Sequence, residues 1–282
     1  MKLIIGIAVL LGLVASGAAA KAEEQDWPPP AWTEPVAPFR IADTVYYVGT
    51  KGIGAYLITG PKGHVLIDAG LAESAPVVAS NIAALGFDIA DVRYLLISHA
   101  HFDHAAGLAE LKRLSGARLW ASRGDKPALE SGHNAGRPEL PPFPAVTVDH
   151  LVRDGEMLRL GPVRLRALLT PGHTPGCTSW EMRTGGHRYI FACSLTVAGQ
   201  KLTGDPAYPD AAADFRRSFA KLERRQADIF LTFHAEFFDM KGKRARLAAG
   251  DADAFVDPSE LPRRVKDAEQ AFAREVEAQA AE

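Results

Sequence analysis

The feature that most constrains this chain is the six-residue cluster 99–104, which reads His-Ala-His-Phe-Asp-His. The apolar, β-rich segment 92–97 lies just before it, and a helical pattern begins just after it at Leu108. A disordered histidine-rich tract would lack such ordered flanks. Three histidines and one aspartate held between a strand and a helix therefore predict a metal site at the edge of a sheet.

The spacing inside the cluster predicts two neighbouring metal positions. Alternate residues of extended chain point to the same side, so His99 and His101 should project together. Asp103 and His104 follow where the chain turns toward the helix, and they should point at an adjacent position.

Two more histidines follow strands in the second half of the chain. His173 comes after the predicted strand 163–169, and His234 directly follows the predicted strand 228–233. Three protein ligands and a water molecule are typical of a catalytic zinc site. We therefore group His173 with the first position and His234 with the second, and we expect zinc because imidazole and carboxylate ligands suit it better than magnesium or calcium. The other four histidines, which we expect to have ordinary surface or core roles, are His64, His133, His150 and His187.

The remaining pattern predicts an α+β fold, a sandwich of two packed, mainly antiparallel sheets with helices on the outer faces. Prolines 28–38 indicate an extended arm, and 133–146 indicates a long loop. The predicted strands are 45–48, 55–59, 64–68, 92–97, 156–160, 163–169, 178–183, 188–192 and 228–233. The predicted helices are 75–86, 108–114, 211–226 and a segment after Pro262.

The N-terminus predicts export from the cytoplasm. A lysine is followed by an apolar run and by small residues that offer A-x-A cleavage sites, which is the layout of a signal peptide over 1–22. The mature domain would then be 23–282. The apolar run is short for a membrane anchor, so we expect no membrane attachment after cleavage and a periplasmic or secreted protein.

The net charge of the chain disfavours several classes of partner. The 282 residues carry a net charge of −2, and removal of 1–22 takes away two lysines and no acids, which leaves about −4. No stripe of lysine or arginine stands out along the sequence, so nucleic acid and anionic membranes are poor candidate partners. We expect a monomer that acts on a small molecule.

The chain has two cysteines, Cys177 and Cys193, on either side of a predicted hairpin whose turn centres on Gly185. They should face each other across the two strands, and an oxidising compartment would favour a disulfide. The alternative is that Cys193 is a thiolate ligand of zinc. We prefer the disulfide and keep the alternative open.

At these residues the sequence resembles the metallo-β-lactamase superfamily, and within it a subclass B3 enzyme from about residue 27 onward. The signature H-x-H-x-D-H is followed by Gly107, and further motifs occur in the expected order. These motifs are 46–59 (YYVGTKGIGAYLIT), 67–70 (IDAG), 170–177 (TPGHTPGC), 191–195 (FACSL), 214–222 (DFRRSFAKL) and 233–240 (FHAEFFDM).

The resemblance implies two zinc ions per chain. His99, His101 and His173 would bind the first, and Asp103, His104 and His234 would bind the second. Asp68 would orient one of these ligands. Other hydrolases of the superfamily usually place a bridging aspartate at the strand end that reads Ala-Cys-Ser here, at 192–194. Its absence favours a β-lactamase over a glyoxalase-type thioesterase.

The implied reaction is hydrolysis of the β-lactam amide in penicillins, cephalosporins or carbapenems by a zinc-bound hydroxide that Asp103 helps to hold. Ser194 and Thr196 would bind the substrate carboxylate. Ile53, in a mobile tip with its flanking glycines, would give an apolar contact. The alternative functions are a zinc lactonase or thioesterase of the same superfamily, because a fold does not determine a substrate, and a metal-binding protein without catalysis.

Overall fold

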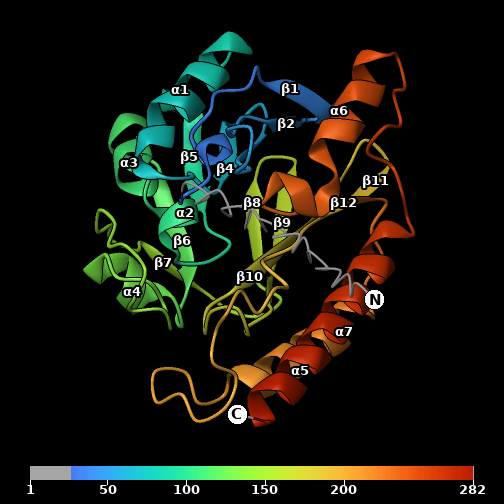
Figure 1. The fold of residues 1–282 in the computed structure, drawn as a ribbon. Coiled ribbons are helices and arrows are strands. Elements are labelled where there is room, and N and C mark those ends of the chain that lie inside the picture. The colour runs from blue at the N-terminus through green and yellow to red at the C-terminus, as the bar shows by residue number, and fades with distance from the viewer. Residues whose placement is uncertain (1–26, 282) are drawn as a thin grey trace, which may run out of the picture.

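The computed structural model describes residues 27–281, so the expected signal peptide lies outside the described residues. Two sheets pack face to face, with helices on their outer sides (Figure 1). The first sheet contains, in order, β1 (Phe39–Ala42), β2 (Val45–Tyr47), β3 (Tyr56–Ile58), β4 (His64–Ile67), β5 (Val92–Leu96), β6 (Arg118–Ser122) and β7 (His150–Val152). The second contains β12 (Ile229–Leu231), β11 (His187–Phe191), β10 (Thr178–Thr184), β9 (Val163–Leu169) and β8 (Met157–Leu160).

Both sheets are mixed. Strands β1 to β4 pair antiparallel, whereas β4 to β7 pair parallel. The parallel half arises because helices connect these strands, and a parallel pair needs such a crossover. In the second sheet only β11 and β12 pair parallel. The predicted sandwich is therefore confirmed, and the first sheet is parallel over half of its pairings.

Helices cover the outer faces of both sheets. The helices are α1 (Ala75–Ala84), α2 (Phe102–Ala105), α3 (Leu108–Ser115), α4 (Lys126–Ser131), α5 (Ala211–Leu222), α6 (Met240–Ala248) and α7 (Glu260–Ala280). Figure 1 shows α1 and α3 beside the first sheet, and α5 alongside the C-terminal α7. None of the described helices is both long and apolar enough to cross a membrane.

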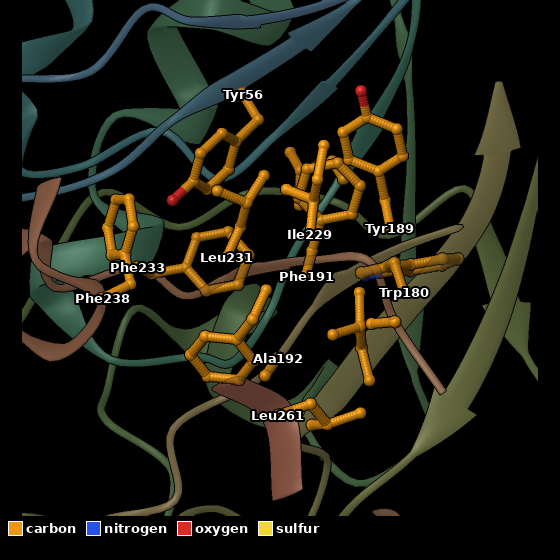
Figure 2. Packing of buried hydrophobic residues seen from close by; sticks show 14 of the residues in the cluster. Tyr56, Trp180, Tyr189, Phe191, Ala192, Ile229, Leu231, Phe233, Phe238 and Leu261 are labelled. Carbon is orange, nitrogen blue, oxygen red and sulfur yellow. The ribbon is translucent and has the colours of Figure 1, made fainter. Parts of the chain in front are cut away.

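The core between the sheets is aromatic near the site. Tyr56 of β3 lies against Phe191 and Phe233, with ring centroids 5.2 and 5.5 Å apart (Figure 2). The Trp180 indole donates a hydrogen bond to the carbonyl of Ile97. These contacts from opposite sheets fix the strand ends on which the histidines lie.

The predicted elements are found, with differences in detail. Helix α5 ends at Leu222, four residues before the predicted end, and the loop 133–146 contains no helix or strand. The sequence did not indicate β1, α2, β6, α4, β7 or α6. The strand β7 has three residues and α6 is rich in lysine and arginine, so neither has the apolar pattern on which such a prediction depends. The predicted arm includes a short 3-10 helix, Pro30–Trp32.

Candidate metal centre

Five histidines and one aspartate meet at one edge of the sandwich. His99 follows β5, His173 follows β9 and His234 follows β12. His101 precedes the short helix α2, which carries Asp103 and His104. All six side chains that the sequence singled out are thus brought together, because the carboxyl ends of these strands lie at the same edge.

The first group consists of His99, His101 and His173. One ring nitrogen of each lies within 4.8 Å of the others, and all three residues are buried. Ring centroids are 4.6 to 4.8 Å apart. The Nε2 atom of His99 is buried and has no hydrogen-bond partner among the described residues. An unpaired buried nitrogen is costly, and a metal ion at this position would satisfy it.

The second group consists of Asp103, His104 and His234. The Nε2 atoms of the two histidines lie 3.2 Å apart, and each lies 3.2 Å from Oδ2 of Asp103. Ligands of a tetrahedral zinc at about 2.0–2.1 Å are roughly 3.3 Å from each other. This triangle of three atoms therefore has the size that such an ion requires.

The other ring nitrogen of three histidines is held by a hydrogen bond. Nδ1 of His104 donates to Oδ2 of Asp68 at 3.1 Å. Nε2 of His101 donates to the carbonyl of Ala135 at 3.1 Å, and Nδ1 of His173 donates to that of Thr196 at 2.8 Å. Each bond selects the tautomer that leaves the opposite nitrogen bare and pointing into the group, which is how metal-binding imidazoles are oriented.

Electrostatics separate the two groups. Burial lowers the pKa of His101 to about 4 and holds the pKa values of His99 and His173 well below the usual range. These rings are neutral near pH 7, which is the form that binds metal. Burial also disfavours charge on His104, but the nearby carboxylates of Asp103 and Asp68 outweigh it and raise the pKa of His104 to about 10. The two carboxylates therefore favour a positive charge at the second group, either a proton on His104 or a metal ion in its place.

Asp68 is itself buried, and it contacts His104 directly and His99 through the hydroxyl of Ser98. Its Oδ1 accepts from the backbone N–H of Ser98, and its Oδ2 accepts from the Ser98 hydroxyl, both at 2.6 Å. The Ser98 Oγ also lies 3.0 Å from Nδ1 of His99. Asp68 has a φ of 60°, a left-handed conformation that non-glycine residues seldom adopt. The Asp68 carboxylate thus connects the first group, through Ser98 and His99, with the second group, through His104.

Sequence reasoning missed Asp125. This buried carboxylate accepts from the Ala100 N–H at 2.9 Å, from the Thr174 hydroxyl at 3.1 Å and from the Gly176 N–H at 3.0 Å. It thereby connects the loop of His99 and His101 with the loop of His173. No spacing in the sequence links a residue at the start of α4 with these two loops, so only the fold reveals it.

A hollow of about 240 Å³ opens over the metal-site groups. Ser194 and Thr196 line it, and their hydroxyls lie 3.0 Å from each other. Trp32 forms an aromatic wall, with its ring centroid 5.1 Å from that of His234. The side chains of Trp27, Arg137 and Phe237 also line the hollow, and none was singled out in the sequence.

The prediction for Ile53 is wrong. This residue is 1% exposed and packs in the core, and its backbone bridges to His234. The neighbouring Gly54 N–H donates to the Phe233 carbonyl at 2.7 Å. Residues 52–54 therefore support the strand end that carries His234. The apolar surface of the hollow comes instead from Trp32 of the N-terminal arm.

The two cysteines form a disulfide, with Cα atoms 5.9 Å apart. Cys193 Sγ lies 3.8 Å from Nδ1 of His99, so the disulfide borders the first group. The alternative role of Cys193 as a thiolate ligand does not apply in this oxidised form.

The four histidines expected to have ordinary roles lie outside both groups. His64 packs on Phe87, and His133 is exposed. His150 and His187 contact the carboxylates of Glu156 and Asp43.

Comparison with known proteins identifies the family. The model of the family described as "Metallo-beta-lactamase superfamily" matches residues 49–234. A Cronobacter sakazakii metallo-beta-lactamase with an HARLDQ motif is 46% identical with a TM-score of 0.87, and the match covers 89% of this chain and 98% of that one. BJP-1, a subclass B3 metallo-beta-lactamase of Bradyrhizobium japonicum, is 40% identical with a TM-score of 0.84, covering 89% and 98%. FEZ-1 from Legionella gormanii is 38% identical with a TM-score of 0.85, covering 88% and 98%.

Curated relatives match over shorter stretches. A probable metallo-hydrolase of Burkholderia pseudomallei is 36% identical over 147 residues, which is 50% of this chain and 47% of the relative. A hydroxyacylglutathione hydrolase of a Bradyrhizobium strain is 31% identical over 119 residues, 42% of this chain and 39% of the relative. The chain spans less than half the length of these two relatives.

Proposed function

This chain belongs to the metallo-beta-lactamase superfamily, a family of zinc-dependent hydrolases, and we propose that it is a di-zinc β-lactamase of the B3 type. The observation that carries this proposal is the similarity to three β-lactamases over nearly their whole length, at 38–46% identity. The Cronobacter protein is described by the motif HARLDQ, whereas residues 99–104 here read HAHFDH. This chain thus offers three histidines in its motif.

We assign the first zinc to His99, His101 and His173. The second zinc is assigned to Asp103, His104 and His234, whose ligand atoms are 3.2 Å apart. When bound, zinc lowers the pKa of a water molecule until it is nucleophilic near neutral pH and polarises the carbonyl under attack.

The protein's own groups position the reactants. Burial raises the pKa of Asp103, but His104 and His234 outweigh it and hold this pKa well below its usual range, so the carboxylate is ionised and accepts a hydrogen bond from the attacking water. It also aligns that water with the amide carbon. Trp32 and Phe237 line the hollow and give it apolar surface.

We propose that three polar side chains hold the substrate's carboxylate. Ser194 and Thr196 offer hydroxyls, and Arg137, which pairs with Glu139, brings its guanidinium to the same hollow. The Arg137 Nη1 atom donates to the Ala198 carbonyl at 2.8 Å, which holds the guanidinium close to this side of the site. A charged hydrogen bond from arginine to a carboxylate is worth more than a neutral one.

A thioesterase is the second candidate, and the hydroxyacylglutathione hydrolases among the curated relatives favour it. Against it stands the strand end after β11, which carries Cys193 in a disulfide where such hydrolases usually have an aspartate. A zinc lactonase would use the same metal ligands.

A parallel substrate assay tests the proposal. The zinc-loaded protein is given nitrocefin, a carbapenem, an acyl-homoserine lactone and S-lactoylglutathione under the same conditions. We expect kcat/KM for a β-lactam to exceed that for the lactone and the thioester by at least a hundredfold. A thioester or lactone turned over fastest would reject the β-lactamase assignment and leave the metallo-hydrolase assignment intact. The Asp103→Ala variant is the control for metal-site catalysis.

We also propose that 1–22 is cleaved as a signal peptide and that the mature domain, 23–282, acts in the periplasm or outside the cell. The disulfide supports this proposal, because such bonds persist in oxidising compartments. Mass spectrometry of the protein recovered from the periplasmic fraction would give the N-terminal residue.

A further inference from the structure

The outward face of the second sheet carries an arginine cluster far along the strands from the metal centre. Arg164 and Arg166 are two apart on β9, so both point to the same side. The register pairs Arg159 with Arg164, Arg166 with Glu181, and Arg183 with Arg188. Residues opposite each other point to the same face. Five arginines from four adjacent strands therefore share one face: Arg159, Arg164, Arg166, Arg183 and Arg188.

Two of these cross-strand pairs place like charges directly opposite each other. Arg159 faces Arg164 across β8 and β9, and Arg183 faces Arg188 across β10 and β11. Such pairs destabilise a sheet. A ligand of opposite charge would relieve this repulsion.

All of these arginines except Arg159 line a hollow of about 520 Å³. Arg224 and Arg225, just after α5, complete its wall opposite the strands. Its lining includes six arginines and, as the only carboxylate, Glu181. A hollow of this volume holds a small molecule.

The carboxylates nearby do not neutralise the cluster. Asp228 pairs with Arg188 at 2.9 Å, and Glu181 lies 3.7 Å from Arg225. Among residues 27–281, no carboxylate pairs with Arg164, Arg166, Arg183 or Arg224. The Nε atom of Arg225 is buried and has no hydrogen-bond partner in the same range. The hollow thus presents several unpaired positive charges and one unpaired buried donor.

Strand direction separates this hollow from the metal centre. Strand β9 runs from Val163 toward Leu169 and then leads to His173, so Arg164 lies near its opposite end and Arg166 at its midpoint. Arg183 lies at the end of β10 that is distant from Thr178. The cluster and the catalytic hollow share no lining residue.

We propose that this arginine-lined hollow binds an anion that carries two or more phosphate groups. Guanidinium groups match phosphate oxygens in paired hydrogen bonds, and several of them around one hollow suit a multiply charged ligand better than a single carboxylate. The ligand is either a free phosphorylated molecule or the headgroups of anionic phospholipids. The sequence showed no basic stripe, because these arginines are spread over four successive strands and are separated by other residues.

The test uses inorganic pyrophosphate and the zinc-loaded protein in isothermal titration calorimetry. The double variant Arg164→Gln/Arg166→Gln should bind pyrophosphate at least tenfold more weakly than the unmodified protein. The matched control, Arg113→Gln/Arg263→Gln, removes the same charge from exposed positions on α3 and α7 and should keep the affinity. Pyrophosphate that binds at zinc would be common to all three proteins. A second double variant, Arg183→Gln/Arg224→Gln, should repeat the loss.

Sedimentation with vesicles distinguishes the two sources of phosphate. Capture by phosphatidylglycerol vesicles but not by phosphatidylcholine vesicles, with loss in the Arg164/Arg166 variant, assigns the ligand to lipid headgroups. Pyrophosphate binding without capture assigns it to a free molecule. Nitrocefin turnover should be the same in all these variants. Equal binding by the variant and the control in both arms, or no binding in either, would overturn the proposal.

Discussion

At the scale of single residues, the six proposed metal ligands and Asp68 came from the sequence, whereas the other groups that support them did not. Six ligand residues follow from the cluster 99–104 and from histidines placed just after strands, because metal binding needs particular side chains at particular spacings. These other supports are the carboxylate of Asp125 and the backbone carbonyls of Ala135 and Thr196. Any loop supplies carbonyls, and Asp125 has no motif of its own, so these supports appear only when the loops are seen together.

The substitution Asp68→Asn tests the support of the second metal position. The amide can accept one hydrogen bond, but its NH₂ would face the donors of Ser98 and His104. We expect a 10- to 100-fold loss of zinc affinity at the second position, which is the usual effect of removing such a partner. Competition with a chromophoric chelator measures both positions, and the first should change less. Unchanged affinity at the second position would show that His104 does not depend on Asp68.

The buried Asp125 predicts a dependence of stability on pH. Burial raises its pKa from 3.8 to about 6, in spite of the hydrogen bonds that it accepts. The folded state therefore holds this proton more tightly than the unfolded state, so the stability that Asp125 contributes is fully present below about pH 4 and is lost as pH rises toward 6. The change is about 3 kcal/mol for a shift of this size.

Urea unfolding at several pH values, with saturating zinc, measures this change against Asp125→Asn, which cannot titrate. The stability advantage of the unmodified protein over the variant should shrink by about 3 kcal/mol between pH 4 and pH 6.5. Because other groups titrate equally in both proteins, the difference isolates Asp125. A constant difference across this range would mean that Asp125 is ionised throughout.

At the scale of elements, strand ends were predicted well and the contacts between loops poorly. The loops 122–125 and 174–177 meet backbone to backbone, and a Cβ at Gly176 would lie 2.2 Å from Ser122 Oγ and 2.3 Å from Asp125 N. Only glycine fits there. A glycine in the sequence signals a turn as readily as such a contact, so the pattern did not distinguish the two.

The disulfide joins the first residue before β10 with the second residue after β11, and its removal should cost stability without loss of metal. For cysteines 16 residues apart, we expect the double substitution Cys177→Ser/Cys193→Ser to lower the free energy of unfolding by about 3 kcal/mol. Denaturant titration measures this loss. The zinc content of the folded variant should equal that of the unmodified protein. A fall in zinc content with the fold intact would restore Cys193 as a ligand.

At the scale of the whole molecule, the sandwich was predictable because each half of the chain repeats strands with apolar faces followed by helices. Two surfaces of the molecule could not be predicted from the sequence. The aromatic wall of the catalytic hollow comes from an N-terminal arm that the sequence described only as extended. The arginine cluster arises from the register of four strands, which no local pattern encodes. Both depend on which segments the fold brings together.

The central test is nitrocefin turnover measured against zinc added to chelator-stripped protein, with bound metal counted in the same samples. We expect no turnover without metal and a rise that is complete at two zinc ions per chain. We further expect the variant His234→Ala, which leaves the first group intact, to bind one zinc tightly and to turn over nitrocefin at least a hundredfold more slowly. Turnover by the stripped protein, or full activity of His234→Ala with one zinc bound, would contradict the assignment of a two-zinc β-lactamase.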